Sequence, residues 1–139
     1  MSDHLRITTK NDLAELGRLS GEIEVFLQRA GAGAAGIYAT NLALEEMFTN
    51  IVKYGYDDTL THEILVSLHV ESDNIILVLE DDGHEFNPLT VPAPDVSLPL
   101  AKRKIGGLGI HIVRRMVENM DYRRANNRNI LTLTTRLRP

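Results

Sequence analysis

The chain of 139 residues contains no cysteine. Disulfide bonds, thiol nucleophiles and cysteine-ligated zinc are therefore excluded. Positive charge is not in excess either, because the formal net charge is -4, whereas a general nucleic-acid binder is usually basic. No apolar run approaches the roughly 20 residues that span a bilayer, and the first residues lack the basic-then-apolar layout of a secretory signal. We therefore expect a cytoplasmic protein without a membrane partner, which forms one domain over residues 1–139.

Several catalytic motifs are missing as well. The five histidines are scattered, with no His-Glu-x-x-His pair, and His62 and His69 are interpreted as surface residues of a strand. No Gly-x-Ser-x-Gly nucleophile elbow is present. The glycine-rich stretch 106–109 is not followed by Gly-Lys-Ser/Thr, and it lacks the third glycine of a dinucleotide fingerprint. The sequence thus gives no indication of a zinc protease, a serine hydrolase, a P-loop or a dinucleotide-binding fold.

The hydrophobic pattern predicts the order strand, helix, helix, two strands, long loop, helix, two strands. Helical spacing covers residues 13–27, 34–54 and 109–120, with Gly55 placed to end the second helix. Alternation covers 63–71 and 129–136, and shorter strands are predicted at 5–9, 75–79 and 122–124. On the predicted helices, Phe48, Met116 and Met120 are interpreted as core. This order predicts a two-layer α/β sandwich, with a mixed, mostly antiparallel sheet covered by helices on one face.

The stretch 87–104 is predicted to have no regular structure. Four of the five prolines fall in it, and proline removes a backbone donor and disfavours the helical conformation of the residue before it. A loop of this length in a small domain is uncommon and is often functional. We expect residues of about 87–104 to form a lid.

Three groups of residues could carry chemistry, and the first lies on the helix predicted at 34–54. Glu46 and Asn50 are one turn apart on the same face, where a carboxylate and an amide oxygen can share a hydrated Mg²⁺. Glu45 is rotated by about 100° from Glu46 and cannot serve the same site equally. The alternative is a solvated glutamate pair beside an incidental asparagine.

The second group, Asp81 and Gly83, follows an apolar strand. A carboxylate at this position could accept a hydrogen bond from the exocyclic amine of adenine. Guanine presents a carbonyl acceptor there instead, so an aspartate would select ATP over GTP. The alternative is an ordinary turn, because Asp-Gly is a common turn signal.

The third group is the glycine turn 106–109, which opens the helix predicted at 109–120. Glycines allow the backbone to approach an anion closely, and the free N–H groups of a helix N-terminus attract negative charge. The basic run 102–104 lies just before the turn and could add phosphate contacts. The alternative is a flexible hinge with a solvated basic run.

The order of the three groups is more specific than any of them alone. A helix with Glu-x-x-x-Asn, a strand ending in Asp-x-Gly and Gly-x-Gly at a helix start resemble the GHKL ATPase superfamily of gyrase, heat-shock chaperone, histidine kinase and mismatch-repair ATPases. Within it, three stretches are similar to the anti-sigma factor/serine-protein kinase family: LALEEMFTNIVKYGY, LEDDGHEFNP and IGGLGIHIVRRMVENMDYRR. The resemblance implies the histidine-kinase-like ATPase fold, with ATP and Mg²⁺ as ligands.

The resemblance also implies a role for individual residues. Glu46 matches the catalytic base of the family, and Asn50 matches the magnesium ligand. The resemblance implies that the nucleotide is bound by Asn50, Asp81 and Gly83 and by Gly107 and Gly109 of the glycine turn. We also expect Leu108 of this turn and Arg103 of the basic run to bind it. Two positions depart from the family pattern: Glu85 stands where many members have a second glycine, and Tyr54 where many have a histidine.

The function implied by the resemblance is that of a protein-serine kinase. Its substrate would be a small anti-sigma-factor antagonist, phosphorylated on serine, and its second partner a sigma factor. Members usually act as homodimers, so we expect a homodimer, with no direct contact to nucleic acid. The alternative is a nucleotide-gated protein-binding module with little or no kinase activity.

Overall fold

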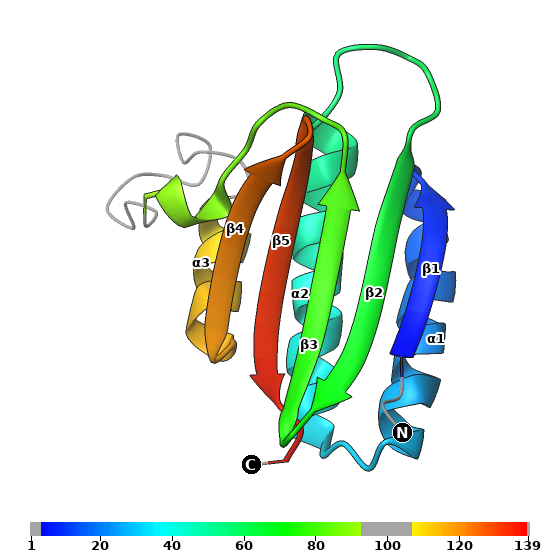
Figure 1. Cartoon of the computed structure of the whole chain (residues 1–139), viewed down its shortest axis with the longest axis vertical. Helices are drawn as coiled ribbons and strands as arrows, with labels where there is room; N and C mark the ends of the chain where they lie inside the picture. Colours follow the sequence, from blue (N-terminus) through cyan, green and yellow to red (C-terminus); the bar gives the residue numbers. More distant parts are fainter. Residues whose placement is uncertain (1–3, 93–106, 139) are drawn as a thin grey trace.

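The computed structural model describes residues 4–92 and 107–138, and its framework is a five-stranded sheet (Figure 1). The strands are β1 (His4–Lys10), β2 (Glu63–Glu71), β3 (Asn74–Asp81), β4 (Asn119–Ala125) and β5 (Arg128–Arg136). Their order across the sheet is β1-β2-β3-β5-β4, and all four pairings are antiparallel. The sheet is therefore not mixed as the sequence predicted, because every neighbour in it runs in the opposite direction.

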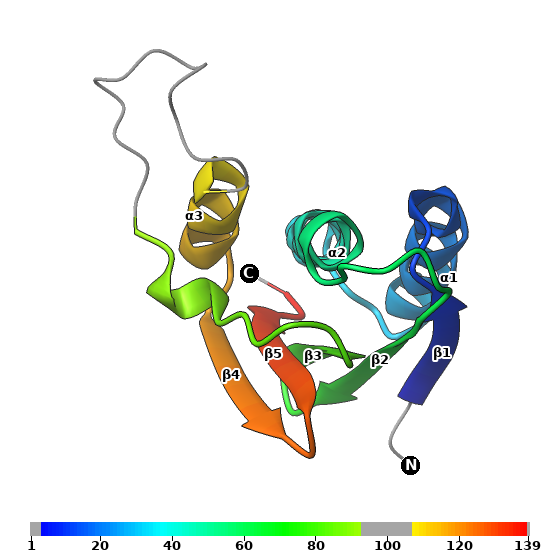
Figure 2. The same cartoon turned by 90° about the horizontal axis from the view of Figure 1, so that it is seen from above.

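Three α-helices cover one face of this sheet (Figure 2). They are α1 (Leu16–Arg29), α2 (Ala34–Tyr54) and α3 (Gly107–Met116), with α2 between the other two. A short 3-10 turn, η1 (Leu13–Glu15), precedes α1. A second one, η2 (Pro88–Thr90), follows β3 along the chain. The two-layer sandwich predicted from the sequence is confirmed. No described helix combines the length and the hydrophobicity that crossing a lipid bilayer requires.

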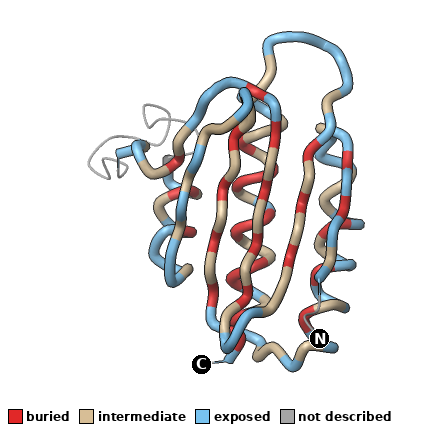
Figure 3. Tube along the Cα trace, viewed as in Figure 1, coloured by how far each residue is buried: buried red, intermediate tan, exposed pale blue. Residues whose placement is uncertain are grey.

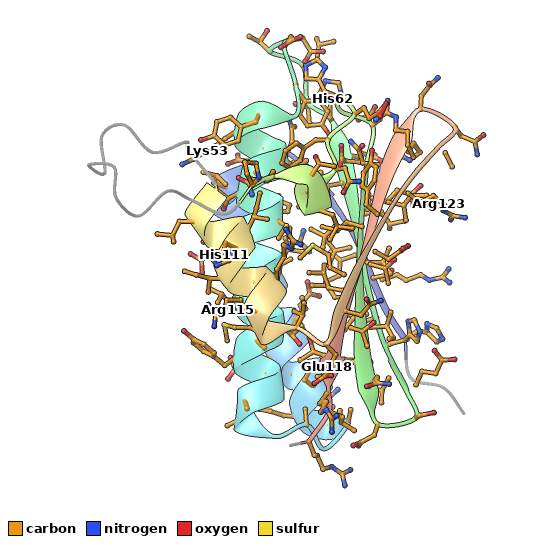
Figure 4. All side chains as sticks on the ribbon, turned by 90° about the vertical axis from the view of Figure 1, so that its left-hand side faces the viewer. Lys53, His62, His111, Arg115, Glu118 and Arg123 are labelled. Atoms are coloured by element: carbon orange, nitrogen blue, oxygen red, sulfur yellow. The ribbon has the colours of Figure 1, made fainter. Side chains whose placement is uncertain are left out.

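The core lies between the sheet and the helices, and the strands show it as alternating burial (Figure 3). Leu77 and Leu79 of β3 and Leu133 of β5 face the helices, where Phe48 of α2 is fully buried as predicted. None of the described helices lies on the opposite face of the sheet, and Arg123 extends away from the helices there (Figure 4). Thr132 alternates with buried neighbours on β5 and therefore lies on this open face.

The helix predicted at 109–120 is shorter and shifted, because sheet pairing competes for its end. The backbone N–H of Val117 still bonds to a helical carbonyl, but that of Glu118 bonds to the carbonyl of Thr134 on β5. Met120 then lies opposite Leu133 within β4. The prediction of Met116 as core is wrong, since it is 37% exposed at the helix end.

Residues 93–104, most of the predicted lid, lie outside the described residues, so the lid stays a prediction. Its described start contains η2, where no regular structure was expected. Asn87 caps this turn by accepting a hydrogen bond from the N–H of Leu89, and Pro88 follows the cap, where its missing N–H costs nothing.

Candidate functional site

The end of α2, the end of β3 and the start of β5 meet at the same end of the molecule (Figure 1). A pocket opens there, with Asn50 and Asp81 in its wall. Its volume is ≈ 160 Å³, close to the roughly 150 Å³ of an apolar cavity that holds benzene. Much of the remaining lining is apolar or aromatic, namely Met47, Ile51, Tyr54, Phe86, Tyr122 and Leu131. The pocket therefore offers a planar ring an apolar slot with a few polar groups, as small-molecule sites usually do.

Asp81 is the last residue of β3 and is only 4% exposed. Its Oδ1 accepts two hydrogen bonds, from the backbone N–H of Gly83 at 2.9 Å and from Nδ2 of Asn129 at 3.0 Å. Neither bond involves Oδ2, the second oxygen of this carboxylate. Burial raises the pKa of Asp81, and the two hydrogen bonds oppose that shift. The structure thus holds a desolvated carboxylate in a pocket wall with one oxygen engaged.

Gly83 lets the chain turn tightly against the end of α2. A Cβ atom at this position would lie 2.5 Å from the carbonyl oxygen of Gly55 and 3.0 Å from Oδ1 of Asp81. The N–H of His84 donates to the same Gly55 carbonyl at 2.8 Å. Glycine at 83 is therefore needed for the turn to pack against the helix end beside Asp81, and α2 ends at Tyr54 as predicted.

Asn50 lies in the next-to-last turn of α2 and is 8% exposed. Its Nδ2 has no hydrogen-bond partner among the described residues, although the atom is buried. A buried amide without a partner costs free energy, and such a group at a pocket wall indicates a polar ligand. The sequence placed Asn50 at a ligand site, and its burial and lack of a partner fit that placement.

Glu46 lies one turn before Asn50, half-buried, whereas its neighbour Glu45 is exposed. Gly109, in the first turn of α3, packs against Glu46 so closely that a Cβ atom there would overlap the carboxylate. The structure thereby places Glu46 next to the start of α3, whereas Glu45 is exposed to solvent. Glu46 does not line the pocket that holds Asn50 and Asp81.

The remaining residues of the predicted phosphate site are only partly described. Gly107 begins α3, two residues earlier than the helix predicted from the sequence, and Leu108 is largely exposed. Gly106 and Arg103 lie outside the described residues, so their phosphate contacts stay predictions. Tyr54 and Glu85, which depart from the family pattern, both line the pocket.

Sequence reasoning missed Asn129, whose side chain takes part in five hydrogen bonds in this region. It lies directly opposite Asp81 in the β3–β5 register. No local pattern marks it, because the pairing joins positions 48 residues apart in the sequence. Only the strand register brings it to the site.

A second missed group surrounds His62, which precedes β2 instead of lying in a strand as the sequence suggested. Figure 4 shows it at this end of the molecule, near the last turn of α2. Its ring stacks on Tyr56 at 4.0 Å, and its two nitrogens face Asp58 at 2.7 Å and Asp82 at 3.4 Å. The hydrogen bond to Asp58 raises the pKa of His62, and burial raises the pKa of Tyr56. This cluster links the loop after α2 to the residue that follows Asp81.

The candidate site thus combines a carboxylate and an asparagine amide in one largely apolar pocket with a glutamate against a nearby helix start, on an α/β sandwich. Residues 9–135 match the model of the histidine kinase-like ATPase domain. The chain belongs to this family, whose name implies ATP binding.

Distant relatives are kinases by name. The serine/threonine-protein kinase BtrW of Bordetella bronchiseptica is 24% identical over 102 residues, which make up 73% of this chain and 72% of that protein. The serine-protein kinase RsbW of Halalkalibacterium halodurans is 23% identical over 123 residues, or 86% of this chain and 74% of that protein.

A solved structure shows the same fold. The RsbU and RsbW domains of Rv1364c from Mycobacterium tuberculosis match 97% of this chain with a TM-score of 0.70 and 20% identity. This chain spans 32% of that longer protein, and the likeness concerns the fold.

Proposed function

We propose that this protein binds ATP with Mg²⁺ between α2 and the sheet and uses it to phosphorylate a serine of an anti-sigma-factor antagonist. The observation that supports this most directly is the joint placement of Asp81 and Asn50. Two buried polar side chains share the wall of a ring-sized apolar pocket. Among the described residues nothing bonds to Nδ2 of Asn50, and the bonds to Asp81 engage only its Oδ1.

The pocket residues account for recognition of the base. Asp81 would accept a hydrogen bond from the exocyclic amine of adenine through Oδ2, since its Oδ1 already has two donors. Tyr54, Phe86 and Tyr122 offer aromatic surface beside the carboxylate. Guanine would present a carbonyl oxygen to a carboxylate oxygen, so the site favours ATP.

The other end of the nucleotide would reach Asn50 and the start of α3. The side-chain oxygen of Asn50 suits a hard cation such as Mg²⁺, which is usually bound by one or two protein ligands and by substrate phosphates. Residues 107–109 would offer the free N–H groups of a helix start to the phosphates. When bound, ATP–Mg²⁺ supplies the phosphoryl group and the charge that polarises it.

Glu46 would act on the attacking serine hydroxyl. The serine oxygen bonds to the γ-phosphorus, the bond from that phosphorus to the bridging oxygen breaks, and Glu46 accepts the hydroxyl proton while ADP leaves. Proton acceptance by a carboxylate helps as charge develops, and positioning supplies most of the effect. The nearness of Glu46 to α3 supports this role.

The sigma factor as second partner and the homodimer belong to the same proposal, on the strength of the sequence resemblance and of the distant RsbW and BtrW kinases. A binding module that changes partner affinity with nucleotide, without phosphoryl transfer, uses the same ATP site. The two functions differ only in whether the γ-phosphoryl group of ATP is transferred to the partner.

The deciding experiment incubates the protein with γ-labelled ATP, Mg²⁺ and candidate anti-sigma-factor antagonists. We expect a serine of the antagonist to become labelled, and we expect the rate of labelling to fall at least a hundredfold in Glu46→Gln. Glu45→Gln is the matched control, because this exposed glutamate is the sequence neighbour of Glu46, and it should retain activity. ATP binding without transfer to any antagonist would replace the kinase with the binding module, and absence of ATP binding would reject both.

A further inference from the structure

Asn129 lines the pocket, is 6% exposed and lies at the centre of a network of polar groups. Its Nδ2 donates to Oδ1 of Asp81 at 3.0 Å and to the carbonyl of His84 at 2.7 Å. Its Oδ1 accepts from the hydroxyl of Tyr122 at 2.6 Å and from Nη1 of Arg124 at 3.1 Å. The backbone N–H of Phe86 also approaches this oxygen, at 3.3 Å.

These partners fix which way the amide of Asn129 points. Arg124 and the backbone N–H of Phe86 can only donate, so the oxygen must face them. The carbonyl of His84 can only accept, so the NH₂ group must face it and, with it, Asp81. A flipped amide would lose these bonds in a buried site, which is costly. The donor to Asp81 is therefore set by the surroundings.

We propose that Asn129 is the positioning residue of the base site. Its side chain bonds to Oδ1 of Asp81, so that only Oδ2 is presented to the ligand. It also bonds to residues of the pocket wall and so fixes the wall relative to the same carboxylate. The proposal rests on the proposed ATP site and adds a determinant of its base selectivity. Asn129 acts through Asp81 and through the wall, not as a catalytic group.

The second half of the proposal follows from where the other partners lie. His84, Phe86 and Tyr122 all line the pocket, and each has a hydrogen bond to Asn129. Arg124 also donates to the carbonyl of Gly83 at 2.9 Å, within the same turn. Through Asn129, one side chain of β5 connects Asp81 with the turn after β3 and with the β4 residues of the pocket wall.

Two variants separate the donor from the rest of the network. Asn129→Asp keeps the oxygen that faces Tyr122 and Arg124 but places a second carboxyl oxygen against Asp81. Asn129→Ser keeps a small polar group, but its side chain is too short for the hydrogen bonds that Nδ2 and Oδ1 of the asparagine make. Thr132→Ala, on the open face of the same strand, is the matched control. Affinities for ATP and GTP are measured from pH 6 to 8 by calorimetry, with folding checked by thermal unfolding.

We expect Asn129→Asp to bind ATP at least tenfold more weakly than the wild type at pH 8. The deficit should shrink toward pH 6, because two adjacent carboxyls share a proton that can replace the lost donor. The other titratable or charged groups that interact with Asp81 are Asp82, Arg124, Tyr56 and Tyr122, and both proteins retain them. Asn129→Ser should weaken ATP binding at all pH values and narrow the preference for ATP over GTP.

The outcomes distinguish this inference from the function on which it rests. If the wild type binds ATP and both Asn129 variants match Thr132→Ala in affinity, selectivity and pH profile, the positioning role is wrong and the ATP site stands. If Asn129→Asp has the wild-type pH profile despite weaker binding, the contact is merely structural. If the wild type binds neither nucleotide, the proposed function itself fails.

Discussion

Glu46 of α2 and Gly109 of α3 are in contact, and any side chain at 109 would overlap the glutamate carboxylate. The contact makes the position of the proposed base depend on the absence of a Cβ atom on the neighbouring helix. It also brings a carboxylate close to the free N–H groups at the start of α3, where the phosphates are expected. Five changes test the consequences of this arrangement and of the site beside it.

Gly109→Ala should displace Glu46 and reduce phosphoryl transfer at least tenfold. In a Glu46→Ala background the same change should cost no stability, because the overlapping atoms are gone. Thermal unfolding of the two single variants and the double variant measures this coupling. Additive effects would show that Glu46 and Gly109 do not constrain each other.

Gly21→Ala is the control for glycine replacement in a helix, since no atom of the described residues lies within 4 Å of the added Cβ. An alanine inside a helix restricts the unfolded chain and favours the helix, so we expect a gain of about 0.5–1 kcal/mol in the free energy of unfolding. Denaturant titration measures it. A loss of stability would mean that α1 has packing demands on this face that the structure does not show.

Gly83→Ala should lower the free energy of unfolding by about 1–3 kcal/mol, a typical cost of forcing atoms into a packed region. The added Cβ meets the backbone carbonyl of Gly55, which cannot rotate away as a side chain can. ATP affinity should fall with it, because the turn also holds Oδ1 of Asp81. Thermal unfolding and ATP titration together test both effects, and a variant as stable as Gly21→Ala would contradict the packing argument.

Asp81→Asn should abolish strong ATP binding without lowering the stability of the nucleotide-free protein at pH 7. Burial raises the pKa of Asp81, so the charged form is disfavoured in the folded state and weakens stability above the ordinary pKa of about 3.9. The variant removes that cost and keeps an oxygen for Gly83 and Asn129. Its advantage in stability should therefore shrink as the pH falls toward 4. Unchanged ATP affinity would remove Asp81 from base recognition.

Asn50→Ala should leave the nucleotide-free protein at least as stable as the wild type, because its buried Nδ2 has no hydrogen bond to any described residue that the substitution would remove. It should nevertheless weaken ATP binding in the presence of Mg²⁺ by at least tenfold. Titrations with and without Mg²⁺ separate loss of the metal ligand from loss of the pocket wall. Equal affinity for wild type and variant would place the metal elsewhere.

Local patterns predicted the parts of the site that lie on one element. Helical spacing placed Glu46 and Asn50 on one face of α2, because rotation along a helix is fixed per residue. The order of the three motifs then favoured Glu46 over Glu45. An apolar run ending in Asp-x-Gly placed Asp81 at the end of β3. These placements needed only the geometry of a single helix or strand.

Where two local preferences competed, the sequence could not decide between them. Residues 117–120 continue the apolar spacing of a helix, yet pairing with β5 draws the chain into β4. The roles expected of Gly106 and Arg103 stay predictions, because both lie outside the described residues.

The sequence by itself determined the layered fold, the family and the residue types of the site, since periodicity and motif order are properties of the chain. Only the tertiary structure decided that Asn129 donates to Asp81, that His62 stacks on Tyr56, and that a side chain at 109 would displace the Glu46 carboxylate. Each of these contacts joins different elements. Its distance is set by strand register and helix packing, which no local stretch of sequence encodes.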